Sequence, residues 1–294
     1  MPTLRQLTTD LTTALTPVYE AREAEAIAAQ LLEHLLHLTP LQRRMQAQEV
    51  VDETRLLELA AMQARLLRHE PLQYVLGTAH FAGLELEVTP ATLIPRPETE
   101  ELVELIAREQ AGRAGLQVLD VGTGSGCIPL ALAGRLPGCH LTAVDVSMEA
   151  LVVARRNAVH YEVVIDFQQV DVLTQVPMLA GPLDVLVSNP PYVLENERPL
   201  MRPNVLQYEP ATALFVPDHD PLLFYRRIAE LGRELLTVGG SLYFEINEQF
   251  APETVAMLKT LGYTHAVAHN DIFDKARMVR AIWPGAAQAR IIER

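Results

Sequence analysis

The sequence predicts an α/β protein whose main part is a doubly wound, mostly parallel sheet, with a small helical bundle before it. Two observations support this prediction. Up to about residue 68, leucines and alanines recur at helical spacing, whereas beyond residue 100 short apolar segments of strand character alternate with helical ones. The 294 residues, 49% of them hydrophobic, suffice for one large α/β domain and a smaller one.

Residues 1–76 are expected to form the helical domain. Pro40 suits the first position of a helix, and the charged run 52–68 predicts a long amphipathic helix that ends before Pro71. No residue here belongs to a motif that points to chemistry, so a packing module is the simplest interpretation. The clearest apolar stripe consists of Ala24, Ile27, Ala28, Leu31, Leu32 and Leu35.

Residues 77–90 are expected to form a β-hairpin linker. Between Leu72 and Val88 the pattern changes to short apolar alternation, and Gly77 and Gly83 supply the breaks that turns require. The hairpin therefore joins the helical domain to the domain that follows.

Residues 91–294 are expected to form the α/β domain. Alternation of strands and helices places parallel strands side by side, so a ligand is expected where their carboxyl ends meet. The predicted helices are 101–111, 128–135 and 148–160, and the predicted strands are 117–121, 140–144, 163–169 and 183–188.

Bulk properties exclude several classes of protein. No apolar stretch approaches the roughly 20 residues that cross a bilayer, and the mixed residues 1–10 fit neither a secretory signal nor a transit peptide. A cytoplasmic protein that does not bind membranes is therefore expected. The formal net charge of −13 disfavours a nucleic-acid partner. Cys127 and Cys139 are expected to be reduced thiols, and no bound metal is expected.

A glycine-rich loop joins the predicted strand 117–121 directly to a helix. Gly122, Gly124 and Gly126 allow a ligand to approach the backbone closely, as a nucleotide-like cofactor requires. The dinucleotide fingerprint needs its third glycine one residue later, where this chain has Cys127, which counts against NAD. A purely structural turn is the alternative interpretation.

Acidic residues near this loop suit S-adenosylmethionine, which needs acceptors for its ammonium and ribose hydroxyls but no phosphate clamp. Asp120 precedes the loop, Thr123 lies within it, and Asp145 ends the next predicted strand, where a carboxylate can bind both ribose hydroxyls. Asp171 follows the strand after that. It either meets the adenine amino group or caps the segment that follows it.

The tetrad Asn189-Pro-Pro-Tyr192 follows the predicted strand 183–188. Its prolines fix the backbone, so the carbonyl of Pro190 and the side-chain oxygen of Asn189 can hold both hydrogens of a planar NH2 group. The nitrogen is then directed at a sulfonium methyl. The tetrad indicates methylation of an amino group, and adenine, cytosine and a glutamine amide all remain possible substrates. A structural Asx-Pro turn is the alternative.

With this tetrad, the loop 118–126 and the segment Leu93-Ile-Pro-Arg-Pro-Glu-Thr-Glu100, the chain resembles the bacterial release factor glutamine methyltransferases over most of its length. The resemblance implies a Rossmann-like class I methyltransferase domain with S-adenosylmethionine as cofactor and S-adenosylhomocysteine as product. It implies N5-methylation of the glutamine in the Gly-Gly-Gln loop of class 1 peptide chain release factors, which modulates translation termination. If the substrate is a release factor, the helical domain and the hairpin are expected to contact it away from the glutamine, because so short a loop offers little surface for affinity.

The resemblance assigns roles to individual positions. Gly122, Gly124 and Gly126 correspond to the family's cofactor loop, Asp145 to its ribose-binding acid and Asp171 to the position near adenine.

The remaining assignments concern the substrate. Asn189, which also borders the cofactor, and Pro190 correspond to the pair that holds the amide, and Tyr192 to the aromatic residue beside the substrate glutamine. The segment 94–97 corresponds to one that lines the site, and Phe81 is either an aromatic contact with the cofactor or a core residue. The expected substrate-binding residues are Asn189, Pro190, Pro191, Tyr192, Arg96 and Pro97.

Alternatives remain at this point. A sibling family methylates a glutamine of a large-subunit ribosomal protein, but there Ser-Pro usually follows Pro-Arg, where this chain has Pro97-Glu-Thr-Glu100. A nucleic-acid adenine N6-methyltransferase and a non-catalytic cofactor-binding protein are weaker alternatives. The segment 216–221 lacks the glycines that are usual in the family, and Asn247 stands where a glycine is usual. Both are distant from Asn189 in sequence, so we expect altered loops without a change in chemistry.

Overall fold

The computed structural model describes residues 1–286, which form two compact units. One unit consists of residues 1–78 together with 202–208. The other consists of 79–201 and the chain from residue 209 onward. The short segment 202–208, which the sequence does not single out, therefore belongs with the N-terminal unit.

The N-terminal unit is helical. Its buried core is formed mainly by leucines, among them Leu15, Leu31 and Leu66, none of which is exposed to solvent. The helices are α1 (Leu4–Leu15), α2 (Ala21–Leu36), α3 (Pro40–Met45), α4 (Glu53–Leu66), α5 (Leu72–Leu76) and α9 (Pro203–Tyr208).

Capping residues fix where these helices begin. Thr3 and Thr39 each form a capping box with the glutamine three residues later, and Pro40 occupies the first turn of α3. The side chain of Asp52 accepts from the backbone N–H of Arg55 at the start of α4. The predicted helix start at Pro40 is thus confirmed.

The hairpin lies within residues 77–90, where it was expected, and follows a short helix. Residues 72–76 form the helix α5, which Gly77 ends with a φ of 78°. Only β1 (Thr78–Phe81) and β2 (Leu84–Glu87) pair, around a turn in which Ala82 and Gly83 have positive φ. Residues 72–76 thus belong to the helical part, as the expected boundary at residue 77 implied, although a short apolar run does not by itself distinguish a strand from a buried helical turn.

The hairpin is bound to helix α8 (Met148–His160) of its own unit. The backbone N–H of Glu85 donates to the Tyr161 hydroxyl, which donates in turn to the Glu85 carbonyl, and the amide of Asn157 exchanges two bonds with the Glu87 backbone. Phe81 is buried among core residues of α6 and α7. Of its two interpretations, the core one agrees with this position.

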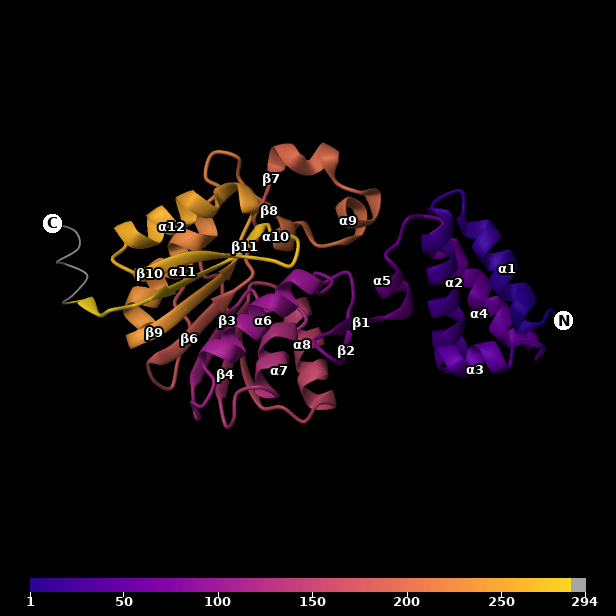
Figure 1. Cartoon of the computed structure of the whole chain (residues 1–294), viewed down its shortest axis with the longest axis horizontal. Helices are drawn as coiled ribbons and strands as arrows, with labels where there is room; N and C mark the ends of the chain where they lie inside the picture. Colours follow the sequence, from indigo (N-terminus) through magenta and orange to yellow (C-terminus); the bar gives the residue numbers. More distant parts are fainter. Residues whose placement is uncertain (287–294) are drawn as a thin grey trace. The chain divides into compact units, whose positions relative to one another are not determined.

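The second unit is built on a seven-stranded sheet in the order β10-β11-β9-β6-β3-β4-β5 (Figure 1). The five strands from β9 to β5 run parallel, and β11 pairs antiparallel with both β9 and β10. The strands are β3 (Gln117–Val121), β4 (His140–Asp145), β5 (Ile165–Gln169), β6 (Leu183–Ser188), β9 (Leu236–Glu245), β10 (Thr264–Asn270) and β11 (Ala276–Ile282).

Helices cover both faces of this sheet (Figure 1). Val118 and Val185 pack with residues of α6 (Pro97–Glu109) and α7 (Cys127–Ala133), whereas their neighbours Leu119 and Leu186 pack with residues of α11 (Leu223–Leu235) and α12 (Ala251–Thr260). Successive strand residues thus point to opposite faces. The predicted doubly wound, mostly parallel α/β fold is confirmed.

A connection of short elements links β6 to α11. It contains β7 (Val193–Leu194), which pairs in parallel with β8 (Phe215–Val216). The connection also contains the 3-10 helix η1 (Glu195–Leu200) and the single-turn helix α10 (Ala211–Leu214). A second 3-10 helix, η2 (Glu248–Phe250), lies elsewhere, after β9. Among the described residues, no helix is both long enough and apolar enough to cross a membrane.

A close contact in α11 provides a test of the packing. A Cβ on Gly232 would collide with the hydroxyl of Tyr263, which is buried and donates to the Ala229 carbonyl at 2.7 Å. We expect Gly232→Ala to lower the free energy of unfolding by about 1–3 kcal/mol, because overpacking outweighs the helix propensity gained, roughly 1 kcal/mol. Chemical denaturation measures this.

The matched control is Gly181→Ala, because a Cβ at Gly181 has no neighbour within 4 Å. Equal stability of the two variants would contradict the packing described for α11.

Candidate active site

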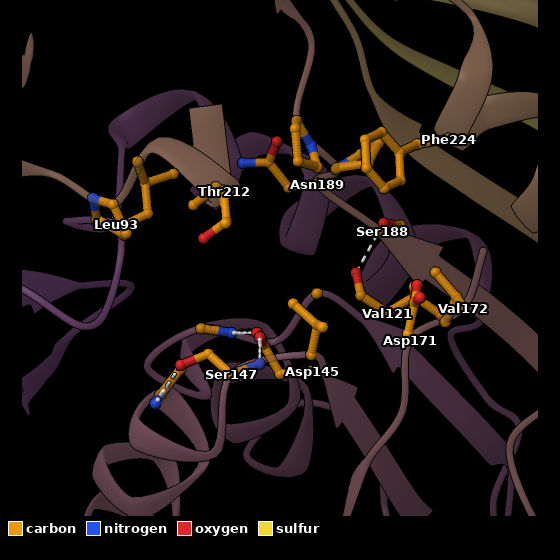
Figure 2. A pocket seen from close by; sticks show the side chains of 18 of the residues that line it. Leu93, Val121, Asp145, Ser147, Asp171, Val172, Ser188, Asn189, Thr212 and Phe224 are labelled. Carbon is orange, nitrogen blue, oxygen red and sulfur yellow. Dashed lines mark hydrogen bonds between the residues drawn. The ribbon is translucent and has the colours of Figure 1, made fainter. Parts of the chain in front are cut away.

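A cavity of about 360 Å³ lies where the parallel strands end, and the second unit alone lines it. Figure 2 shows Asp145 and Ser147 on one side of this cavity, with Asn189, Thr212 and Leu93 across from them. The predicted site residues that line it are Gly122, Gly124, Asp145, Asp171, Asn189, Pro190 and Pro191.

The glycine loop forms part of the cavity wall. Gly122 and Gly124 have φ angles of 75° and 55°, a region that favours glycine, and the N–H groups of Gly122 and Thr123 both donate to the Val144 carbonyl. A Cβ on Gly122 would lie 4.0 Å from the carbonyl oxygen of Asn189. The loop therefore brings bare backbone to the ligand and close to the tetrad.

Gly126 has a different position. It begins α7 with a φ of 81°, and a Cβ there would lie 3.3 Å from the Cβ of Ala154 on α8. Gly126 therefore permits close packing of the two helices and does not line the cavity. Its contact with the cofactor stays a prediction.

Asp145 connects the loop to helix α8. Its carboxylate accepts from the N–H of Gly124 and from the N–H of Ser147, both at 2.9 Å. Burial raises the pKa of Asp145, and these two hydrogen bonds act in the opposite direction. The carboxylate thus shapes the cofactor loop while lining the cavity.

Asp171 also lines the cavity, but its carboxylate is engaged locally. It accepts from the N–H of Leu173 and from the hydroxyl of Thr174, both at 3.0 Å. These bonds agree with the capping alternative. Contact with adenine stays a prediction.

Asp120 and Thr123 do not line the cavity, although Val121 and Gly122 between them do. Asp120 is fully buried, and among the described residues neither of its oxygens has a hydrogen-bond partner; the hydroxyls of Thr123 and Ser125 are equally unpartnered. Burial raises the pKa of Asp120 to about 7. A carboxyl group and two hydroxyls thus lie buried without partners directly behind the glycine loop.

The tetrad is fixed at both ends. The Ser188 hydroxyl donates to the Val121 carbonyl at 2.7 Å, and the Asn189 side-chain nitrogen donates to the Thr99 hydroxyl at 3.2 Å. Tyr192 lies outside the cavity wall, where its hydroxyl donates to Glu245 at 3.1 Å. Burial raises the pKa of Tyr192 well above its usual value, so the phenol stays protonated.

Arg96 and Pro97 do not line the cavity either. The guanidinium of Arg96 contacts the carboxylate of Glu209 at 2.5 Å, and the same carboxylate accepts from the N–H of Ile94 at 3.1 Å. The preceding residues 91–93 form the wall instead. Arg96 and Glu209 thus hold the segment that shapes the cavity, and direct substrate contact by Arg96 and Pro97 stays a prediction.

Sequence reasoning missed several residues of the site. Glu209 stands between Tyr208 and Pro210, and nothing local shows that its side chain, 1% exposed, binds Arg96. No role was assigned to Thr99 or Glu245 from the sequence either, because no local pattern shows which distant groups their side chains contact. The unpredicted residues of the cavity wall include Thr212, Phe215 and Phe224.

The two unusual positions lie nearer the tetrad than their sequence distance suggests. The side-chain nitrogen of Asn247 donates to the Tyr192 carbonyl at 3.2 Å. Val216, the first residue of the other atypical segment, pairs with Leu194. The expectation that both lie far from the tetrad, which rested on their distance along the chain, was wrong because strand pairing brings the segments together.

Comparison with known proteins agrees with this geometry. Residues 98–203 match the Methyltransferase small domain, and residues 6–77 match the PrmC N-terminal domain. The release factor glutamine methyltransferase of Bacteroides thetaiotaomicron is 41% identical over 95% of this chain and 99% of its own length; that of Flavobacterium psychrophilum is 40% identical over 94% and 98%. This chain belongs to the release factor glutamine methyltransferase family.

The fold of this family member also occurs among solved structures. A methyltransferase from Pyrococcus furiosus superposes with a TM-score of 0.50 at 20% identity, over 77% of this chain and 99% of the other. The resemblance recognised from the tetrad and the glycine loop is confirmed by the relatives, and the class I methyltransferase fold by the structure.

This methyltransferase takes its methyl group from S-adenosylmethionine, and the residues present fit that cofactor. The ammonium and sulfonium groups are positive, in keeping with the carboxylates of Asp145 and Asp171 in the cavity wall. The positive φ at Gly122 and Gly124 leaves the loop without side chains where the ligand must approach. Among residues 1–286, no group of three or more His, Cys, Asp or Glu side chains could hold a metal ion.

The buried Asp120 predicts a pH-dependent stability. Its pKa of about 7 in the folded protein exceeds the unfolded value near 4, so ionisation favours the unfolded chain and stability falls as the pH rises from about 4 to 7. Relative to Asp120→Asn, the cofactor-free wild-type protein should lose roughly 2–3 kcal/mol between pH 5 and pH 8. Urea unfolding at both pH values measures the difference.

Subtracting the variant removes the contributions of all other titrating groups. A difference between the two proteins that does not change with pH would show that Asp120 titrates normally.

Proposed function

We propose that this enzyme transfers the methyl group of S-adenosylmethionine to the side-chain nitrogen N5 of the glutamine in the Gly-Gly-Gln loop of class 1 peptide chain release factors. The observation that carries the proposal is the position of Asn189 and Pro190 in the wall of the cavity that the glycine loop and Asp145 also line. The identity with relatives of that activity, over nearly the whole chain, supports the choice of substrate.

Asn189 and Pro190 hold the substrate amide in this proposal. The side-chain oxygen of Asn189 and the carbonyl of Pro190 accept the two hydrogens of the NH2 group, which fixes its plane and directs nitrogen at the methyl carbon. As the N–C bond forms, the S–C bond breaks and S-adenosylhomocysteine leaves. The N-methylated amide then loses a proton to water, so no general base is assigned.

The apolar part of the wall favours the same reaction. Leu93, Phe215 and Phe224 border the cavity together with Asn189. Apolar walls exclude water, which strengthens the hydrogen bonds that hold the amide, and they suit the aliphatic stem of a glutamine. The net charge of −13 favours a protein substrate over a nucleic acid, whose phosphates it repels.

Methyl transfer from labelled S-adenosylmethionine to purified release factors tests the proposal. We expect label on the wild-type release factor and none when its Gly-Gly-Gln glutamine is changed to alanine. Asn189→Ala should lower kcat about a hundredfold or more, because a preorganised hydrogen-bond partner of the reacting group is lost.

Cofactor binding by Asn189→Ala, measured by calorimetry, controls for folding. Label on a ribosomal protein or on DNA alone would keep the chemistry and overturn the substrate. Full activity of Asn189→Ala would overturn the role of the tetrad.

We further propose that the helical unit, residues 1–76, binds the release factor outside its Gly-Gly-Gln loop. A single glutamine loop offers little area for affinity, since specific protein complexes bury about 800 Å² on each partner. The unit has no cavity-lining residue, and its helix α3 exposes Leu41 and Met45 by 66% and 77%.

Deleting residues 1–70 separates recognition from chemistry. We expect KM for the intact release factor to rise about tenfold or more, a loss of at least 1.4 kcal/mol of binding, with KM for a short Gly-Gly-Gln peptide unchanged. The peptide reaction shows that the catalytic unit is folded. Equal changes for protein and peptide would argue against recognition by the helical unit.

A further inference from the structure

A buried carboxylate lies behind the tetrad and is connected to Asn189 through one hydroxyl group. The Thr99 hydroxyl donates to Oε2 of Glu245 at 2.6 Å, and the side-chain nitrogen of Asn189 donates to the Thr99 oxygen at 3.2 Å. Thr99 and Glu245 are 2% and 1% exposed. Neither lines the cavity, so both act on a substrate only through Asn189 or Tyr192.

The sheet and the first turn of α6 place these three groups together. Ser188 on β6 lies opposite Phe244 on β9, so Asn189, which follows β6, comes next to Glu245, the last residue of β9. Thr99 is the third residue of α6, whose start is fixed by Pro97. The contact thus joins segments that are 90 and 146 residues apart in the chain.

The direction of each hydrogen bond determines the next. Glu245 accepts from Thr99 at Oε2 and from Tyr192 at Oε1, so the single hydrogen of the Thr99 hydroxyl is donated to Glu245. The Thr99 oxygen can then only accept, and the group of Asn189 that faces it must be the NH2 end of the amide. The opposite orientation would place two acceptors against each other. The side-chain oxygen of Asn189 therefore stays available as an acceptor for a substrate NH2 group.

The same carboxylate also fixes the other end of the tetrad. Oε1 of Glu245 accepts from the Tyr192 hydroxyl at 3.1 Å, and Asn247, two residues on, donates to the Tyr192 carbonyl at 3.2 Å. The N–H of Asn247 is bonded in turn to the Tyr225 hydroxyl. Both ends of Asn189–Tyr192 are thus held from the end of β9.

We propose that Glu245 and Thr99 are positioning residues for methyl transfer: together they orient the Asn189 amide so that its oxygen faces the substrate nitrogen. This inference rests on the proposed function and adds to it the groups that select one of the two amide orientations of Asn189. Without them, the amide can rotate and present its NH2 group, which cannot hold the hydrogens of a second NH2 group.

Thr99→Val tests the inference, because valine keeps the shape of threonine and removes the hydroxyl. With the release factor as substrate, we expect kcat to fall roughly tenfold to a hundredfold, with the Kd for S-adenosylmethionine changed less than about twofold. Thr99→Ser, which restores the hydroxyl, should recover most of kcat.

The matched control is Thr254→Val on α12. Thr254 is also fully buried, and its hydroxyl donates to the Phe250 carbonyl at 2.8 Å, within its own helical turn. This variant should lose stability in thermal unfolding while kcat is unchanged. A fall in kcat common to both variants would assign the effect to stability and overturn the inference.

The double variant Thr99→Val with Asn189→Ala separates positioning from a direct role. If Thr99 acts through Asn189, the double variant is no slower than Asn189→Ala alone. The inference is overturned if the double variant shows the product of the two single losses in kcat, or if Thr99→Val keeps full kcat. Glu245→Gln keeps only one acceptor oxygen for two donors, so its kcat should also fall; full activity of this variant is decisive against the inference if Thr99→Val does not fold.

The wild-type reaction distinguishes the two proposals. Methylation of the release factor by the wild-type enzyme, with unchanged kcat in Thr99→Val, would overturn only the positioning role. Absence of methylation by the wild-type enzyme would overturn the proposed function, and the positioning role with it.

Discussion

The hydrogen-bonded register of the parallel strands is the constraint on which the site depends. Val121 at the end of β3 lies opposite Ser188 at the end of β6, which in turn lies opposite Phe244 near the end of β9. The residues that follow leave the sheet at one edge: the glycine loop, the tetrad and the turn after Glu245. A shift of one residue in this register would turn every side chain to the opposite face and separate these groups.

Two buried carboxylates at this edge have different surroundings. Glu245 accepts hydrogen bonds from Thr99 and Tyr192, so it is a satisfied part of the fold. Asp120 is as deeply buried, yet none of the described residues donates to its oxygens. Burial raises the pKa of both. Burying an acceptor that has no partner is unfavourable, so Asp120 lowers the stability of the fold whereas Glu245 is satisfied within it.

Much of the fold could be predicted from local sequence. The strands Gln117–Val121 and Leu183–Ser188 and the helix Met148–His160 have the predicted bounds, because each is an apolar segment with a clear break at its end. The helix Leu72–Leu76 and the hairpin after it lie on the expected sides of residue 77, although so short an apolar run fits a helical turn as well as a strand. The strands β9, β10 and β11 were not predicted, and the last two depend on antiparallel pairing: β11 pairs with β9, and β10 pairs with β11.

The sequence by itself determined the family, the fold class, the glycine loop and the tetrad, because contiguous residues encode a backbone path: glycines at positive φ and two consecutive prolines. Only the tertiary structure decided which side chains hold that path. Thr99 meets Glu245 across 146 residues, Ile94 meets Glu209 across 115, and Tyr192 meets Glu245 across 53. These contacts arise from strand register and helix packing, and a buried threonine or glutamate has no local pattern that shows which distant group it will bond.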